Sequence, residues 1–370
     1  MKVRLLKDNW TLTVLGDNVY HIPETPIETT VPSTVYETLL KKKLMPDPFY
    51  RDNELDATKL MENEFLYETA FTIDEEERSA DRIFLHFDGI DTIADLYLND
   101  KKIGSAENMN RVWEYDITSL VKKDAADTVY QLKVLLHSPI RYAAMEDQKC
   151  PVGAASDAMP GFPHIRKAAC MYGWDWGPRL PDAGLFRCVS LVSVKTARMA
   201  QVMIAQKHHI IGKTVHGNVV DAVRLTADAE IEWMPDIAKK KAKIVMTVVT
   251  PDGTVCQRAE SNWIDQETES APSACLTGLT CALRSNHVKA SLLVENPKLW
   301  WPNGYGEQNL YQVKVELVTE EEKDIVRRGR NAENHHLPKN ANVQEYMYAT
   351  AYEALLGYLY LTKQTQRLQE

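Results

Sequence analysis

The sequence contains no pair of cysteines in the C-x-x-C spacing that many zinc sites and redox motifs use. Its six cysteines are spread along 370 residues, at positions 150, 170, 188, 256, 275 and 281. A disulfide framework is excluded as well, because such frameworks concentrate their cysteines in short secreted chains. We therefore expect reduced thiols and a cytoplasmic location.

Long apolar runs and an excess of basic residues are also absent. No segment approaches the roughly 20 apolar residues of a membrane span, and the N-terminal stretch MKVRLLKDNWTLTVLGDNVY lacks the apolar core of a signal peptide. The net charge is -9, whereas a general nucleic-acid-binding surface needs a basic face. These absences exclude a membrane segment and favour neutral or polar partners over RNA.

Three familiar functional patterns fail. The stretch IIGKTVHG contains Gly-Lys-Thr, but Lys207 stands where a phosphate-binding loop needs its first glycine. No G-x-S-x-G sequence occurs, so the nucleophile elbow of many hydrolases is missing. His208, His209 and His216 have no flanking pattern of acids or cysteines, and we interpret them as solvated strand residues rather than metal ligands.

What the sequence does contain is a series of short alternating segments rich in β-forming residues. They include FLYETAFTI, DRIFLHFDGI, TIADLYLND and TVYQLKVLLH, and their spacing predicts an antiparallel sandwich. The stretch LYLNDKKIG predicts a hairpin whose turn is Asn99-Asp100. From Ala143 to Ala169 the alternation stops and Gly, Pro and Met accumulate, which predicts a long surface loop of the kind that carries function.

A second set of strands follows FRCVSLVSV and includes VVDAVRLTADAEIEW, KAKIVMTVVTPDGTV, VKASLLVEN and LYQVKVELV. This block has about 120 residues, the size of an immunoglobulin-like sandwich. We interpret the charge run Lys239 to Lys241 as a solvated turn. The pattern changes near Val318, and residues 342–362 place apolar side chains at helical spacing.

Six segments identify the first part of the chain: VPSTVYETLL, PDPFYRDNE, FDGIDTIADLYLND, ENMNRVWEYDIT, IRKAACMYGWDWGPRLPDAG and PKLWWPNGYGEQNLY. Together they resemble the N-terminal, non-catalytic part of the β-mannosidases of glycoside hydrolase family 2. The resemblance implies a mainly β fold: a jelly-roll, galactose-binding-like domain over residues 1–195, then an immunoglobulin-like β-sandwich domain over residues 196–318. A helical segment, residues 319–370, completes the sequence.

The same resemblance implies an activity and a catalytic part that this sequence lacks. The family hydrolyses terminal β-D-mannose residues with retention, so the expected partner is a β-mannoside oligosaccharide. Its two catalytic glutamates lie on a (β/α)₈ barrel, which typically takes about 250 residues. Residues 319–370 are too few for that barrel, so we expect no catalytic residue in this chain and no activity from it alone. A surface that would face the barrel is then exposed and is expected to favour self-association.

The segment GWDWGPRLPDAG supplies the candidate substrate contacts. In a strand, Trp174 and Trp176 would point to one face and Asp175 to the other. The resemblance implies that Asp175, with Trp174 beside it, holds the mannosyl unit, and a carboxylate suits sugar hydroxyls because it accepts charge-assisted hydrogen bonds. The alternative is that both tryptophans pack in the core and Asp175 caps a turn; we assign Trp176 to this structural role.

Two further features receive structural interpretations. Arg166 and Lys167 either contact substrate or hold the loop by salt bridges, and we favour the second role. The run LWWPNG, Leu299 to Gly304, predicts a tight turn that buries a large apolar area.

The C-terminal segment belongs to a different pattern. The motifs RRGRNA and YEALLGYLYL resemble the C-terminal half of the mini-ribonuclease III family. Glu353 matches that family's magnesium-ligating glutamate, and Arg327, Arg328 and Arg330 are candidates for phosphate contacts. The family's other essential acid has no counterpart here, and a lone glutamate holds Mg²⁺ weakly, so no cofactor is expected unless the tail is completed.

The two resemblances together predict a chimera with a join between Leu317 and Glu322. Three functions remain open: the non-catalytic portion of a β-mannosidase, a carbohydrate-binding or scaffolding module, and a fragment of an RNA-processing ribonuclease III-type enzyme.

Overall fold

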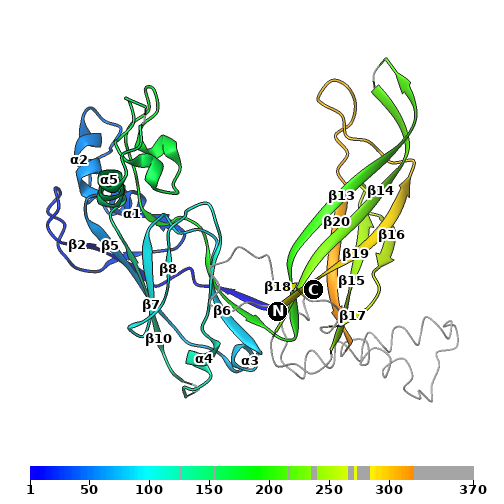
Figure 1. Cartoon of the computed structure of the whole chain (residues 1–370), viewed down its shortest axis with the longest axis horizontal. Coiled ribbons are helices and arrows are strands. Elements are labelled where there is room, and N and C mark those ends of the chain that lie inside the picture. Colours follow the sequence, from blue (N-terminus) through cyan, green and yellow to red (C-terminus); the bar gives the residue numbers. More distant parts are fainter. Residues whose placement is uncertain are drawn as a thin grey trace. The chain divides into compact units, whose positions relative to one another are not determined.

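The computed structural model describes residues 1–125, 127–153, 155–215, 217–234, 240–265, 271–272 and 284–320. The described residues form two compact units, which divide between Ser193 and Val194. Both units are built mainly from strands, so the prediction of a mainly β protein is confirmed (Figure 1). No (β/α)₈ barrel occurs within the described ranges. The tail residues Arg327, Arg328, Arg330 and Glu353 lie outside them, as does His216.

Unit 1 contains two main sheets. The four-stranded sheet has the order β1 (Lys2–Leu5), β12 (Val189–Val194), β6 (Arg82–Phe87), β9 (Trp113–Asp116). The six-stranded sheet has the order β3 (Ile27–Thr29), β2 (Trp10–Leu15), β5 (Glu64–Phe71), β10 (Tyr130–Leu136), β7 (Ala94–Leu98), β8 (Lys101–Ala106). A two-stranded ladder joins β4 (Ser33–Thr34) to β11 (Gly184–Leu185). The helices are α1 (Val35–Lys41), α2 (Asn53–Leu60), α3 (Glu75–Arg78), α4 (Thr118–Val121), α5 (Pro139–Lys149), and the 3₁₀ turns η1 (Phe162–His164) and η2 (Ala169–Tyr172).

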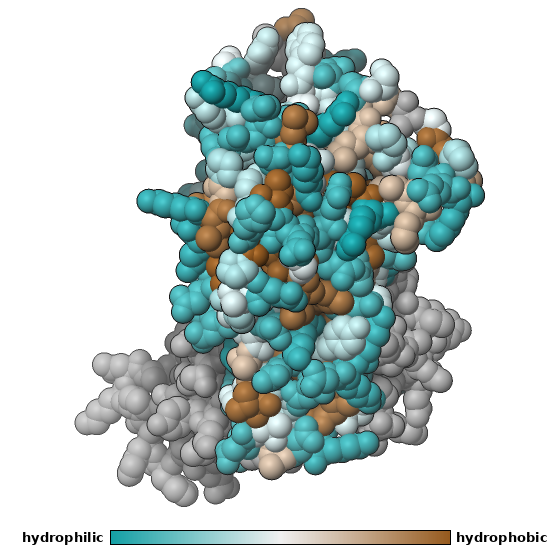
Figure 2. Space-filling view, turned by 90° about the vertical axis from the view of Figure 1, so that its left-hand side faces the viewer, coloured by the Kyte–Doolittle hydropathy of each residue, from teal (hydrophilic) through white to brown (hydrophobic). Residues whose placement is uncertain are grey.

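The alternating segments supply the core of unit 1. Along β5 every second residue is buried, namely Phe65, Tyr67, Thr69 and Phe71, while the residues that alternate with them are partly or fully exposed. Phe65, Tyr67 and Phe71 share one apolar cluster with Leu12 of β2 and Leu85 of β6, so both sheets contribute to the same core. This is the arrangement that period-2 alternation predicts for sheets with one buried face. Outside the core, the face in Figure 2 is mainly hydrophilic, with apolar residues in small groups.

The hairpin at Asn99-Asp100 is confirmed. Strands β7 and β8 pair with Leu98 opposite Lys101, which leaves two residues in the turn. Both turn residues have positive φ, 46° for Asn99 and 63° for Asp100. Asparagine and aspartate tolerate this left-handed conformation better than most residues, and two-residue hairpins of this twist require it.

The expected loop over residues 143–169 is wrong in its first part. Residues 143–149 form the C-terminal portion of helix α5. The helix begins with Pro139, whose missing N–H would be unpaired there in any case, and Ser138 Oγ accepts the N–H of Arg141 at 3.0 Å. Proline at the first position and a serine N-cap are helix-start signals, so the composition of the segment was misleading. From 150 to 183 the described residues contain only η1 and η2 as regular elements.

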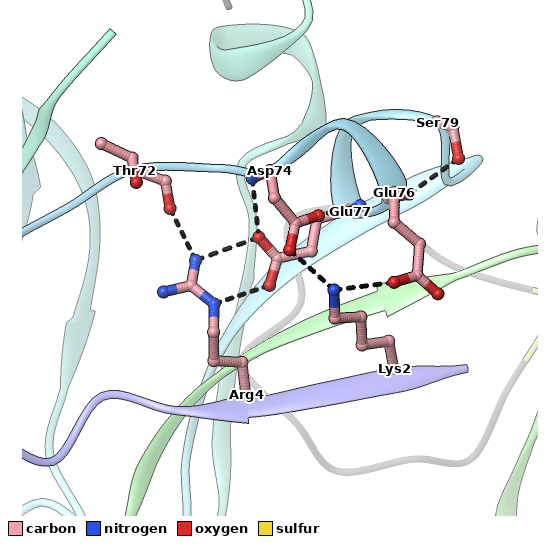
Figure 3. A network of polar contacts seen from close by, with 7 residues as sticks. All are labelled: Lys2, Arg4, Thr72, Asp74, Glu76, Glu77 and Ser79. Carbon is pink, nitrogen blue, oxygen red and sulfur yellow. Dashed lines mark hydrogen bonds and ion pairs between the residues drawn. The ribbon is translucent and has the colours of Figure 1, made fainter. Parts of the chain in front are cut away.

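An ion-pair network fastens β1 to α3 (Figure 3). Arg4 donates from Nε to Glu77 Oε1 at 2.7 Å and from Nη2 to Glu77 Oε2 at 3.0 Å, while Lys2 Nζ contacts Asp74 at 2.7 Å and Glu76 at 2.9 Å. Glu77 is buried and also closes a capping box with Asp74 at the start of α3. The two-pronged geometry makes the Arg4–Glu77 pair stronger than an ordinary surface ion pair.

Unit 2 is a second sandwich. One sheet has the order β13 (Ala197–Thr214), β14 (Gly217–Trp233), β19 (Arg284–Glu295), β18 (Ala271–Pro272). In the other, β15 (Lys241–Val249) pairs with β16 (Val255–Glu260), β17 (Ile264–Asp265) and β20 (Gln312–Thr319). Buried residues from both sheets, among them Ile231, Ile244 and Val288, form one cluster. The strands that alternation predicted after residue 195 are therefore confirmed.

Strand β13 is the main element of unit 2 that sequence patterns missed. It forms a long hairpin with β14, the two green strands that run together in Figure 1. Beyond Met199 and Ala200 nearly all of its residues are exposed, so it lacks the alternation that predicts a half-buried strand.

The LWWPNG run forms the predicted turn, but the expected large burial is wrong. Tyr305 N–H donates to the Pro302 carbonyl at 3.0 Å, and Gly304 has φ 84°, as a tight turn requires. Trp300, however, is 53% exposed. Trp301 packs its ring against Gly306, whereas Trp300 lies in an isolated backbone bridge with Gln308 that leaves its ring largely exposed.

Candidate functional site

The segment Trp174-Asp175-Trp176 forms a tight turn rather than a strand. Trp174 and Gly177 form an isolated bridge, and Asp175 has φ 39°. Trp174 is 64% exposed and Trp176 is fully exposed. The predicted alternation and the assignment of Trp176 to the core are therefore wrong. Gly173, with φ 114°, and the positive φ of Asp175 turn the chain before a strand can form, so all three side chains lie on the surface.

Two residues that sequence reasoning missed hold this turn. The carboxylate of Asp157 accepts the backbone N–H of Asp175 at 2.6 Å. The guanidinium of Arg179 donates to the Asp157 carbonyl at 3.1 Å and 2.9 Å, and Thr58 of α2 donates to the Arg179 carbonyl at 2.7 Å. Within the described ranges, the Asp175 carboxylate itself accepts no hydrogen bond from the turn. Asp157 is 18 positions away from Asp175, so no spacing rule connects them.

Gly173 leaves room for this arrangement. A Cβ atom at this position would lie 2.7 Å from the Asp157 carbonyl oxygen, closer than real contacts allow. We expect Gly173→Ala to displace the turn and to cost about 1–3 kcal/mol, since it adds a backbone clash to an unfavourable φ. Thermal unfolding measures the loss of stability, and acrylamide quenching of the exposed tryptophans measures the displacement of the turn. Gly153→Ala is the matched control, because no atom lies within 4 Å of its Cβ position; equal behaviour of the two variants would contradict the prediction.

The base of the segment is held by three polar residues, Asp91, Lys167 and Asp182, which we call the loop anchor. The Lys167 side chain is completely buried and pairs with the buried Asp91 carboxylate. Lys167 Nζ also donates to the Asp182 carbonyl at 2.7 Å. Arg166 is exposed, and its backbone carbonyl accepts the Met109 N–H at 3.0 Å. The structure thus places Lys167, and not the Arg166 side chain, within the framework of the loop.

Asp182 connects the loop to helix α1. Its Oδ1 accepts the N–H groups of Tyr36 at 3.1 Å and Ala183 at 2.8 Å. Burial raises the pKa of the Asp182 carboxyl to about 6, against the opposing effects of hydrogen bonds from Thr34, Tyr36 and Ala183 and of the Lys167 charge. Part of the folded population therefore holds a proton on this carboxyl at mildly acidic pH.

Backbone hydrogen bonds close the same junction. Asp91 and Gly184 exchange N–H···O bonds at 2.9 Å in both directions, and Val35 N–H donates to the Ala183 carbonyl at 2.8 Å. The chain is thus fixed where it leaves the loop and enters β11.

The described residues offer neither a metal site nor a membrane helix. Among them, no group of three or more His, Cys, Asp or Glu side chains lies close enough to hold a metal ion. None of the helices in the described ranges has the length and apolar character needed to span a membrane.

Comparison with protein families identifies the first unit. Residues 10–187 match the model described as "Glycosyl hydrolase 2 galactose-binding domain-like". Nearly all of unit 1 is therefore similar to this domain family. The match covers the whole six-stranded sheet, the strands β6 and β9 of the four-stranded sheet, the loop anchor and the Trp174-Asp175-Trp176 turn.

The relatives that match the sequence of both units are β-mannosidases. Beta-mannosidase of Capra hircus is 26% identical over 84% of this chain, and Beta-mannosidase B of Emericella nidulans is 29% identical over 86%. A crystal structure of β-D-mannosidase from Dictyoglomus thermophilum superposes with a TM-score of 0.69 at 26% identity and covers 87% of the chain. The chain spans about a third of these proteins: 32%, 34% and 34% of their lengths. It therefore corresponds to the N-terminal portion of a family 2 glycoside hydrolase.

A second family model overlaps the end of the described residues. The model described as "Ribonuclease III domain" matches residues 276–364. Models of two families therefore match one chain, which supports the chimera that the motifs predicted. The matched region includes β19 and β20, which are hydrogen-bonded to β14 and β15 of the sandwich. The position of the join between Leu317 and Glu322 stays a prediction.

Proposed function

We propose that unit 1 supplies a substrate-contacting loop of a family 2 β-mannosidase, with Asp175 and Trp174 as the contacting residues. The observation that supports this proposal is the turn itself, which presents a carboxylate between two exposed indoles. A carboxylate accepts hydrogen bonds from sugar hydroxyls, while an indole covers the apolar face of a pyranose ring. Exposed apolar groups that gather in one place often mark a binding site, which favours a functional over a packing role for these indoles.

Lys167 contributes to this function indirectly. Its ion pair with Asp91 and its hydrogen bond to Asp182 hold the base of the loop, and the Asp157–Arg179 pair holds its tip. We infer that these contacts position Asp175 and that Arg166 supports the loop only through its backbone.

Hydrolysis requires more than this loop. A retaining glycosidase uses two carboxylates about 5–5.5 Å apart. In the family that this chain resembles, both carboxylates belong to the barrel. We propose that a polypeptide of these 370 residues does not cleave β-mannosides until a barrel is supplied. The names of the relatives, β-mannosidases, support β-linked mannose as the substrate class.

A complementation assay tests the proposal. The chain is assayed on a chromogenic β-mannoside alone and with a separately produced barrel from a family 2 β-mannosidase. We expect activity only in the mixture, and we expect Asp175→Ala to lower its kcat/KM about 10- to 100-fold, because hydrogen bonds to a charged group contribute about 1.5–3 kcal/mol.

The matched control is Asp8→Ala, which removes another exposed carboxylate and should leave the rate unchanged. Turnover by the chain alone that disappears in Asp175→Ala would show an unrecognised active site. Activity of the mixture that does not depend on Asp175 would reject its assignment.

The ribonuclease III match supports a second candidate, RNA contact through Arg327, Arg328 and Arg330 with Mg²⁺ at Glu353. We favour the sugar-side function, because the net charge of -9 opposes binding to phosphates. Affinity for structured RNA that falls steeply with salt would reverse this preference.

A further inference from the structure

Strand β13 is the exposed edge of its sheet. It stands first in the order β13-β14-β19-β18, so its backbone pairs with β14 on one side, and the described strands form no ladder on the other. Edge strands of this kind are templates for pairing with another strand unless charges, bulges or proline protect them.

Most of β13 carries such protection. Its outer half contains Lys207, His208, His209 and Lys213, and the ladder is irregular between His209 and Gly212. At the inner end, another irregularity separates Met199 from Gln201. Charged side chains and bulges both hinder the approach of a further strand.

Between these features lies an unprotected stretch, Gln201–Gln206, with the sequence QVMIAQ, which we call the open edge. It has no charge, proline or glycine, and it pairs with β14 residue for residue without interruption. Val202 is 37% exposed and Met203 is 60% exposed. Ile204 is partly buried against the sandwich core. Short apolar segments of this kind pair readily with other strands.

We propose that two copies of this chain associate through the open edge, strand to strand and antiparallel about a two-fold axis at Met203. In this register Met203 faces Met203 of the second copy, and Val202 faces Ile204. Each Lys207 lies opposite Met199 of the other copy, so no two like charges meet. Side chains that face one another point to the same side of the sheet, which satisfies both the two-fold symmetry and the alternation of a strand.

A second copy fits better than an unrelated peptide because the segment is complementary to itself. The register pairs the branched side chains Val202 and Ile204 on the core side of the sheet, and it leaves the amide of Gln201 opposite the small Ala205. Cross-strand pairs of apolar residues stabilise a sheet by about 0.2–1 kcal/mol each. Because the open edge is short, we expect a weak dimer whose fraction depends on protein concentration.

Sedimentation velocity of the full chain over about 1–100 µM tests the proposal, a range in which a weak complex populates both states. Met203→Lys places two like charges directly opposite each other and is expected to raise the dissociation constant about tenfold or more. Val215→Lys is the matched control. Val215 is 95% exposed at the end of the same hairpin but lies outside the open edge, so this variant should dimerise like the parent.

Cysteine cross-linking tests the register. In the proposed dimer Met203→Cys places two thiols opposite each other across the axis, and mild oxidation should give a disulfide-linked dimer above the background of the native cysteines. Val215→Cys should not. A chain that stays monomeric over the whole range, a dimer that is insensitive to Met203→Lys, or equal cross-linking by the two cysteine variants would each overturn the proposal. Enzymatic activity enters none of these measurements, so their outcome is independent of the proposed role of Asp175.

Discussion

Replacing Lys167 with methionine is expected to lower the free energy of unfolding of unit 1 by about 3–5 kcal/mol. The Lys167 side chain is completely buried, and its partner Asp91 is only 2% exposed. Methionine has a similar length but no charge, so it would leave the Asp91 carboxylate buried without its cation. Removing one member of a buried ion pair has this effect because the remaining charge has lost its solvation and its partner. Denaturant unfolding followed by tryptophan fluorescence measures the change.

Two variants make this prediction specific. Lys41→Met removes an exposed lysine paired with Glu37 at 2.5 Å and should change stability by less than about 0.5 kcal/mol. The double variant Lys167→Met with Asp91→Leu removes both buried charges and should recover much of the loss, since apolar replacement of a whole buried pair is often neutral. If Lys167→Met unfolds like Lys41→Met, the ion pair does not hold the loop.

The second large effect is a pH dependence that Asp182→Asn should remove. The raised pKa of about 6 means that the folded protein holds the Asp182 proton more tightly than the unfolded chain, where an aspartate titrates near 3.9. Between about pH 4 and pH 6 the native state therefore binds more protons. The contribution of Asp182 to the free energy of unfolding therefore falls as pH rises through that window and stays low above it. At about 1.4 kcal/mol per pKa unit, the unfolding free energy loses at most about 3 kcal/mol by pH 7.

Asparagine has no such proton, but its side-chain oxygen can still accept the N–H groups of Tyr36 and Ala183. We therefore expect the stability of Asp182→Asn to decline less than that of the parent between about pH 4 and pH 7. Unfolding free energies at several pH values give both slopes. Asp8→Asn, at an exposed position, controls for the change in net charge. Parallel slopes for parent and Asp182→Asn would disprove the assignment.

The sheets were largely predictable because their signal is local. A half-buried strand repeats every two residues, and Phe65, Tyr67 and Phe71 show that repeat directly. The turn at Asn99-Asp100 was predictable for the same reason, since two adjacent residues determine it. Helix α5 was missed although Ser138 and Pro139 are start signals, because the glycines and prolines that follow it dominated the composition.

The site was less predictable because its contacts are distant in sequence. Lys167 and Asp91 are 76 positions apart, and Asp182 and Tyr36 are 146 apart. Sequence patterns singled out Lys167 but neither Asp91 nor Asp157. Trp176 shows the opposite error: an aromatic residue was assigned to the core, although the glycine at 173 and the left-handed backbone at 175 turn it outward. Aromatic content predicts burial only when the backbone conformation is known.

The pairing of β1 with β12 has a consequence for the order in which unit 1 is made. Lys2 lies opposite Ser193, so β1 waits for β12, the last strand of the unit to be synthesised, before its ladder can form. At 5–20 residues per second, that delay is roughly 10–40 s. During this time β2, β5 and β6 are synthesised, and their apolar side chains are exposed until the sheet is complete. Until β12 pairs with β1 and completes the sheet, the exposed apolar surface of the nascent chain favours aggregation.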